Sequence, residues 1–303
     1  MLRRMGMGFL ALIALLFVLV GCQQVRLSPW TKLPEKPEGT LRVATWNVHY
    51  IWLEREEGRW GLSGWEARKG PMDVAFKALE ADLVAFQEME SFSRRSDGNV
   101  NLTRDFLLDQ NPDYRAAATG DARVLPPTQP IFYRPDVLEV LEEGWFHFSP
   151  TPDVLYSRGF DGATPSFASW AVFRRKADGA VFRTINIHFD AFSSTNRMAS
   201  TELTAERMQP WLDAGETVIL LGDFNALHGS RILAKFEALG IIFPKVPGAT
   251  FHLSRGLHLF GAIDHIGVST AAMAPSEPML FNRKTGEVWA SDHHPVLLDV
   301  KLP

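Results

Sequence analysis

Polar side chains capable of chemistry recur where apolar segments of this chain end. The six clusters are Asn47-Val48-His49, Gln87-Glu88, Asn186-Ile187-His188, Gly222-Asp223-Phe224-Asn225, Ile263-Asp264-His265 and Ser291-Asp292-His293. Loops at strand ends are where sheet scaffolds place functional residues. Six such ends meeting at one edge would form a pocket of carboxylates, amides and imidazoles. Each cluster alone also fits a solvated strand end or a turn, so the hypothesis depends on the whole ordered set.

The side-chain types in these clusters suit a hard divalent cation. Mg²⁺ prefers carboxylate, carbonyl and water oxygens to thiolates. Glu88 and Asp292 supply negative charge, and Asn47 supplies an amide oxygen. Such a metal acts as a Lewis acid on a phosphoryl oxygen and stabilises the leaving group. Hydrolysis of a phosphate ester also needs an in-line water and neutralised charge around phosphorus. The set is therefore chemically suited to metal-dependent phosphate-ester hydrolysis.

Hydrophobic periodicity indicates the elements that must position these clusters. Strands are expected at 41–47, 82–87, 131–133, 137–141, 169–174, 181–187, 217–221, 262–268 and 295–300, and helices at 66–80, 196–212 and 232–239. The strands 131–133 and 137–141 are expected to be neighbours, and 169–174 with 181–187 to form a hairpin. Hairpins mixed with strand-helix units favour an α/β protein with mixed sheets. The long stretches 50–69 and 91–130 are expected to be irregular.

The first 39 residues have the pattern of an export signal followed by a tether. Arg3 and Arg4 precede an unbroken apolar run of 12 residues from Phe9 to Val20, which is too short to span a bilayer and suits a signal peptide. The run ends at Cys22 in a segment that resembles the lipobox of bacterial lipoproteins. We expect residues 1–21 to be removed, Cys22 to be lipidated, 22–39 to be a Pro-rich tether and 40–303 to be one domain. The alternative is an ordinary signal peptide with a chance cysteine.

The lipoprotein resemblance also predicts a location. Lipidated Cys22 would anchor the protein to a membrane without spanning it. Gln23 stands where lipoproteins retained at the inner membrane commonly carry Asp. In a Gram-negative cell this favours the outer membrane of the envelope.

Composition excludes several other functions. The 303 residues carry a net charge of −4, and removing Arg3 and Arg4 with the leader leaves −6. That sign disfavours generic binding to duplex nucleic acid, which depends on neutralising phosphates. The single cysteine rules out an intrachain disulfide, a thiolate metal site and, if lipidated, a cysteine nucleophile. Neither a Gly-x-Ser-x-Gly elbow nor a Walker loop occurs in the sequence.

The ordered clusters resemble those of the endonuclease/exonuclease/phosphatase superfamily, the group of deoxyribonuclease I and inositol polyphosphate 5-phosphatases. The resemblance covers roughly residues 41–302. It implies a four-layered α/β sandwich, in which two mixed sheets pack together with helices outside. It also implies a bound Mg²⁺, with Mn²⁺ as an alternative, held by Asn47, Glu88 and Asp292.

The same resemblance implies roles for the remaining site residues. Asp223 and Asn225 would position the attacking water and the phosphate. His293 would be paired with Asp264, as a general base or as a cationic contact to the phosphate. His188 would contact the phosphate or assist the leaving group.

The sequence leaves undecided the effect of two departures from the family pattern and the roles of residues in two loops. Ser166 stands where related bacterial sequences commonly have Arg, and His228 where they have Pro. The loop after Asn47 contains three tryptophans that could flank the pocket or belong to the core, and the loop after Glu88 contains three arginines that could meet an anionic group or be solvated. These residues are Trp52, Trp60, Trp65, Arg94, Arg95 and Arg104.

The sequence therefore supports a leading function and two alternatives. The leading hypothesis is a membrane-anchored, metal-dependent hydrolase of a phosphodiester or phosphomonoester, whose substrate the sequence does not identify. One alternative is a nuclease acting on exogenous DNA or RNA, which the net charge does not favour. The other is a non-catalytic lipoprotein that binds a phosphorylated ligand.

Overall fold

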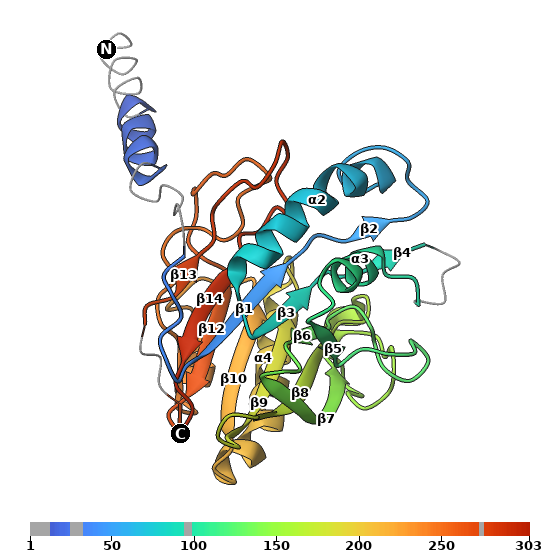
Figure 1. Cartoon of the computed structure of the whole chain (residues 1–303), viewed down its shortest axis with the longest axis vertical. Coiled ribbons are helices and arrows are strands. Elements are labelled where there is room, and N and C mark those ends of the chain that lie inside the picture. The colour runs from blue at the N-terminus through green and yellow to red at the C-terminus, as the bar shows by residue number, and fades with distance from the viewer. Residues whose placement is uncertain (1–12, 25–32, 94–98, 273–275) are drawn as a thin grey trace.

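The computed structural model describes residues 13–24, 33–93, 99–272 and 276–303. Two six-stranded sheets pack face to face, and helices cover their outer faces (Figure 1). A further helix over residues 13–24 lies outside the sheets (Figure 1). Within the described ranges, no helix has the length and apolar character needed to cross a membrane.

The first sheet has the order β13-β14-β1-β3-β6-β5. Its strands are β13 Met279–Leu280, β14 Val296–Val300, β1 Leu41–Asn47, β3 Leu83–Gln87, β6 Ile131–Tyr133 and β5 Arg115–Ala117. The central pair β1 and β3 is parallel, whereas β14 and β6 run antiparallel to them. The sheet is therefore mixed, as the sequence pattern predicts.

The second sheet has the order β11-β12-β10-β9-β8-β7. Its strands are β11 Ile241–Ile242, β12 Asp264–Ser269, β10 Thr217–Asp223, β9 Val181–His188, β8 Phe167–Arg175 and β7 Leu138–His147. Here β10 and β9 are parallel, and the predicted hairpin β8-β9 is confirmed. The expectation that 131–133 and 137–141 are neighbouring strands is wrong, because β6 and β7 belong to different sheets.

The helices complete a four-layered sandwich. They are α2 Leu62–Leu79, α3 Leu102–Gln110, α4 Ser194–Asp213 and α5 Arg231–Glu237, with a short 3-10 helix η1 at Phe160–Gly162. Residues Trp65 and Phe76 of α2 pack on the outer face of the first sheet. Residues Met208 of α4 and Phe236 of α5 pack on the outer face of the second. The expected four-layered fold is confirmed.

Successive side chains along the strands point to opposite faces of the sheet, and those on the inner face fill the space between the two sheets. In β1, Val43 faces the interior between the sheets, where it meets Leu221 and Ile266 of the second sheet. Its neighbour Ala44 faces the helix side instead. This period of two is what a strand buried on both faces requires.

Several elements lie in segments expected to be irregular. Strands β2 Ile51–Trp52 and β4 Ser91–Phe92 pair with each other, and α3 begins where the Asn101 side chain accepts a hydrogen bond from the Arg104 backbone N–H. The helix α2 begins at Leu62, four residues earlier than expected, because Gly61 provides no side-chain cap to mark its start. Residues 25–32 of the predicted tether lie outside the described residues, whereas Leu33 is buried against the first sheet's outer core.

A buried ion pair holds the centre of the first sheet. Arg42 of β1 donates from Nε to Asp299 Oδ1 at 2.8 Å and from Nη2 to Asp299 Oδ2 at 3.0 Å. Both side chains are buried. Removing one partner from such a pair leaves an uncompensated charge.

We expect Asp299→Ala to lower the free energy of unfolding by about 3–5 kcal/mol, because it leaves the Arg42 guanidinium buried without a counter-charge. Urea denaturation of the full chain measures this loss. The double variant Arg42→Met/Asp299→Leu should lose much less, because neither charge is then buried. Equal losses in the single and double variants would contradict this account.

Candidate active site

The six polar clusters meet at one end of the sandwich because of strand direction. Parallel strands β1 and β3 end side by side, with Asn47 opposite Gln87 and Glu88 next. In the second sheet Asp223 at the end of β10 lies opposite both His188 of β9 and Asp264 of β12. The packing of the two sheets brings these ends together.

Unusual backbone conformations mark the exits from the strands. His49, Glu88 and Asn225 have φ of 61°, 53° and 46°, in the left-handed region. Such conformations cost a non-glycine residue about 1–2 kcal/mol and gather at functional sites. Gly222 has φ of 141°, and a Cβ there would lie 2.0 Å from the Ile187 carbonyl oxygen. Glycine before Asp223 therefore lets β10 approach β9 closely.

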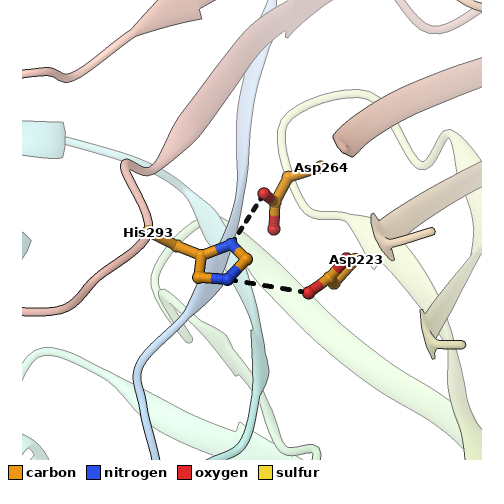
Figure 2. Close-up of side chains that lie close together, drawn as sticks. All are labelled: Asp223, Asp264 and His293. Carbon is orange, nitrogen blue, oxygen red and sulfur yellow. Dashed lines mark hydrogen bonds and ion pairs between the residues drawn. The ribbon is translucent and has the colours of Figure 1, made fainter. Parts of the chain in front are cut away.

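His293 is held between two carboxylates (Figure 2). Its Nδ1 lies 2.9 Å from Asp264 Oδ2, within hydrogen-bond distance, and its Nε2 lies 3.9 Å from Asp223 Oδ2. Burial lowers the pKa of His293, but the adjacent Asp264 carboxylate and its hydrogen bond outweigh burial and raise that pKa to about 10. The imidazole is thus fixed in orientation and favours its cationic form.

The Asp223 carboxylate is the hub of the site. Its Oδ2 accepts a hydrogen bond from Asn47 Nδ2 at 3.1 Å and lies 3.7 Å from His188 Nε2. Its Oδ1 accepts the Asn225 backbone N–H at 2.9 Å. Burial raises the pKa of Asp223 to about 6 and Asp264 adds to the rise, while His293 and His188 act the other way. A carboxyl with this pKa can exchange a proton near neutral pH.

Three oxygen-bearing side chains are suited to a hard cation. Asn47 Nδ2 donates to Glu88 Oε1 at 3.0 Å, while Asn47 Oδ1, the amide oxygen that would bind a metal, accepts the His49 backbone N–H at 3.2 Å. Asp292 is on the same side of the site, because Ser291 Oγ lies 3.5 Å from Asp292 Oδ1 and also donates to the Asn47 carbonyl at 2.7 Å. Burial raises the pKa of Glu88, but His188, the Asn47 hydrogen bond, His293 and His49 together outweigh burial and lower that pKa, so Glu88 stays ionised. Two carboxylates and an amide oxygen fit the ligand preferences of Mg²⁺.

A second group could hold a metal. One ligand atom from each of Asp223, Asp264 and His293 lies within 4.8 Å of the others, and the part of the chain that the structure describes has no other such cluster of three. However, Asp264 Oδ2 is already hydrogen-bonded to His293 Nδ1, and a metal there would break that bond. An imidazole ligand also suits Mg²⁺ poorly. The Asn47, Glu88 and Asp292 set is therefore the better fit.

Buried amides behind the site join the two sheets. Gln87 of the first sheet donates from Nε2 to Asn186 Oδ1 of the second at 2.7 Å. Asn186 Nδ2 in turn donates to the Phe86 carbonyl at 2.9 Å. The sequence pattern placed both residues in clusters but indicated no role for them. Their contacts show that they fix the spacing between the strand ends.

The family model described as the Endonuclease/Exonuclease/phosphatase family matches residues 44–293. The chain belongs to this family. Its members are hydrolases that act on phosphoester bonds, and they generally depend on a divalent metal. The family expected from the ordered clusters is confirmed. A search of curated proteins gives no significant match.

Solved structures of other family members share the fold. A family protein from Bacteroides thetaiotaomicron is 24% identical, with a TM-score of 0.70, covering 86% of this chain and 97% of that one. One from Bacteroides vulgatus is 25% identical, with a TM-score of 0.70 over 87% and 99%. A mannosyl-6-phosphatase of Bacteroides thetaiotaomicron is 25% identical, with a TM-score of 0.66 over 86% and 99%. All three similarities span nearly the whole of the other chain.

The tryptophans and arginines whose roles the sequence left undecided lie in different surroundings. Trp65 is core, in edge contact with Phe106, and Trp60 is half-buried and stacks on His49 at 5.6 Å between ring centroids. Arg104 turns to Asp105 on α3. Arg94 and Arg95 lie outside the described residues.

The two departures from the family pattern lie at the surface or near it. Ser166, in place of the expected Arg, is half-buried, and its carbonyl accepts the Phe148 backbone N–H. His228 is exposed. No hydrogen bond among the described residues links either side chain to the Asp223 hub.

Proposed function

We propose that this protein is a membrane-anchored, divalent-metal-dependent phosphoesterase. The observation that carries the proposal is the contact chain from Asp264 through His293 and Asp223 to Asn47 and Glu88. These contacts link the charged pair of His293 and Asp264 to Asn47 and Glu88, the residues whose oxygens would bind the metal. A phosphate ester placed between the two would meet charge neutralisation on one side and an attacking water on the other.

The site residues have distinct tasks in this mechanism. When bound by Asn47, Glu88 and Asp292, Mg²⁺ supplies Lewis-acid stabilisation of the phosphoryl and leaving-group oxygens. The 3.9 Å between Asp223 Oδ2 and His293 Nε2 leaves room for one water oxygen in contact with both. Asp223 and the cationic His293 orient this water for in-line attack, and the Asp223 carboxylate takes up its proton.

The remaining polar groups of the site support these two tasks. Asp264 holds the orientation of the His293 ring through its hydrogen bond to Nδ1. Asn225 keeps Asp223 in place through its backbone N–H. The half-buried His188 is near both Glu88 and Asp223, where it contacts the phosphate or the departing oxygen.

A substrate panel tests the proposed activity. The purified full chain with Mg²⁺ should hydrolyse at least one phosphate ester among sugar phosphates, inositol phosphates, phospholipids and a bis-aryl phosphodiester. Sugar phosphates are included because a relative of 25% identity is a mannosyl-6-phosphatase. Turnover that is insensitive to EDTA, or no turnover of any member, would overturn the proposal.

Nuclease activity is the second candidate within the same family. The net charge of −6 after loss of residues 1–21 weighs against it. The panel therefore also contains single- and double-stranded DNA and RNA at several salt concentrations. Cleavage that falls steeply with salt would favour the nuclease, because affinity for nucleic acid depends on counterion release.

Membrane anchoring forms the remaining part of the proposal. Cys22 is exposed and is the only cysteine of the chain. We propose that the chain is cut before Cys22, which then carries the lipid that holds the enzyme at the cell envelope, in the outer membrane of a Gram-negative cell. Metabolic labelling with an alkyne fatty acid should mark the wild type and not Cys22→Ser, and labelling of both would refute the assignment.

A further inference from the structure

A cavity of about 400 Å³ opens beside the metal ligands. Its walls come from α2 and from the loop between β13 and β14, which lie side by side (Figure 1). The two segments are joined there by hydrogen bonds from Thr285 Oγ1 to the Pro71 carbonyl and from Arg68 Nη1 to the Ala290 carbonyl. Asp292 and His49 line the cavity as well. It is therefore continuous with the site but contains none of the groups that handle the water.

The cavity wall contains buried polar atoms that no protein group satisfies. His49 is only 4% exposed, yet neither of its ring nitrogens has a hydrogen-bond partner among the described residues. Its Nε2 lies 3.8 Å from Asp292 Oδ2, which is too long for a hydrogen bond. Arg68 is 5% exposed, and its buried Nε also lacks a partner. Leaving such groups unsatisfied costs about 1–3 kcal/mol each, which points to a ligand that pairs with them.

The charges of the lining favour an anion. The three cations Arg59, Arg68 and Lys284 line the cavity. Among the described residues none of them has a carboxylate oxygen within salt-bridge distance, although Asp292 and Glu88 act on Arg68 through space. Arg68 uses its Nη atoms on the Val48 and His49 carbonyls, which do not neutralise it. The acidic lining residues are Glu287 and Asp292, and Asp292 is assigned to the metal. The uncommitted charge in the cavity is therefore positive.

We infer that this cavity is a subsite for a second anionic group of the substrate, a phosphate or a carboxylate on the part of the molecule that is not cleaved. The inference rests on the proposed function, because the cleaved phosphate is the one placed at Asp223 and the metal. Arg59 and Lys284 attract the second anion from the rim. Arg68 and His49 provide charge and an N–H donor at the inner wall, beside the half-buried Trp289.

Calorimetric binding to the full chain tests the subsite without depending on turnover. The probes are glucose 6-phosphate, which has one anionic group, 6-phosphogluconate, which adds a carboxylate, and glucose 1,6-bisphosphate, which adds a phosphate. Measurements use Asp223→Asn with Mg²⁺, so that no probe is consumed. At least one doubly anionic probe should bind about fivefold or more tightly than glucose 6-phosphate. The tighter of the two identifies which anion the cavity prefers.

A matched pair of double variants locates the effect. Arg59→Ala/Lys284→Ala, made in the same background, should bring the affinity ratio of the doubly to the singly anionic probe close to one. Lys176→Ala/Lys301→Ala removes the same charge from exposed positions at the opposite end of the strands and should preserve the ratio.

Equal affinities for all three probes, absence of binding by both doubly anionic probes, or an unchanged ratio in the first double variant would each overturn the subsite. Failure of the proposed function has a different signature. In that case the wild type hydrolyses no member of the substrate panel, while the ranking of the three probes is still measured by heat alone.

Discussion

The variant His293→Ala is expected to lower kcat by about 10²- to 10⁴-fold, the usual contribution of a positioned acid-base group. The imidazole is the only group of the described site that contacts both carboxylates, with Nδ1 2.9 Å from Asp264 and Nε2 3.9 Å from Asp223. Alanine removes the positive charge beside the phosphate and one of the two contacts to the water. Steady-state hydrolysis of the best substrate in the panel measures the loss.

Two further variants separate this role from a structural one. Asp264→Asn keeps the shape of the residue but weakens its hold on His293, so we expect a loss of at least about tenfold in kcat with a smaller change in KM. His228→Ala removes an exposed histidine near the same strand ends and should leave kcat unchanged. Wild-type activity in His293→Ala, or an equal loss in His228→Ala, would rule out the assigned role.

Metal removal has the second large expected effect. Treatment with EDTA should abolish hydrolysis, and Mg²⁺ or Mn²⁺ should restore it, because no protein group replaces a Lewis acid at the leaving oxygen. Glu88→Gln should weaken metal binding by at least about 10-fold, because losing even a group that supports a ligand costs that much and this variant removes one of the two carboxylate ligands. Binding of Mn²⁺, followed by electron paramagnetic resonance, measures affinity independently of activity.

The same titration decides between the two candidate metal sites. If Asn47, Glu88 and Asp292 hold the ion, Asp264→Asn should bind Mn²⁺ nearly as well as the wild type. If the ion instead lies among Asp223, Asp264 and His293, Asp264→Asn should lose affinity and Glu88→Gln should retain it. The second result would reverse the assignment made from donor chemistry.

Much of the strand framework was predictable because buried strands have apolar runs that end abruptly. The segments 41–47 and 131–133 agree with β1 and β6 at both ends. Strand β7 continues six residues beyond the expected 137–141, since a bulge between Val140 and Glu142 breaks its alternation. The change of sheet between β6 and β7 has no sequence signal, because three turn-like residues suit a hairpin equally well.

The site residues were predictable as a set, and their contacts were not. The ordered clusters located Asp223, Asp264 and His293, since chemistry at strand ends follows from topology. The roles of Arg68 and His49 were missed, because an Arg on a helix and a His after a motif are usually solvated or structural. Only the three-dimensional packing shows that their nitrogens are buried without partners.

The reacting groups are divided between the sheets. Asn47 ends β1 and Glu88 follows β3 of the first sheet, whereas Asp223 and Asp264 belong to the second. Their separation is therefore governed by the aliphatic layer containing Val43 and Leu221. A change of even one methylene in a close-packed layer is felt by the surrounding structure, and catalytic groups must keep their geometry to within about 0.5 Å. Differences in turnover between homologous enzymes of this architecture can consequently originate in residues that no substrate ever touches.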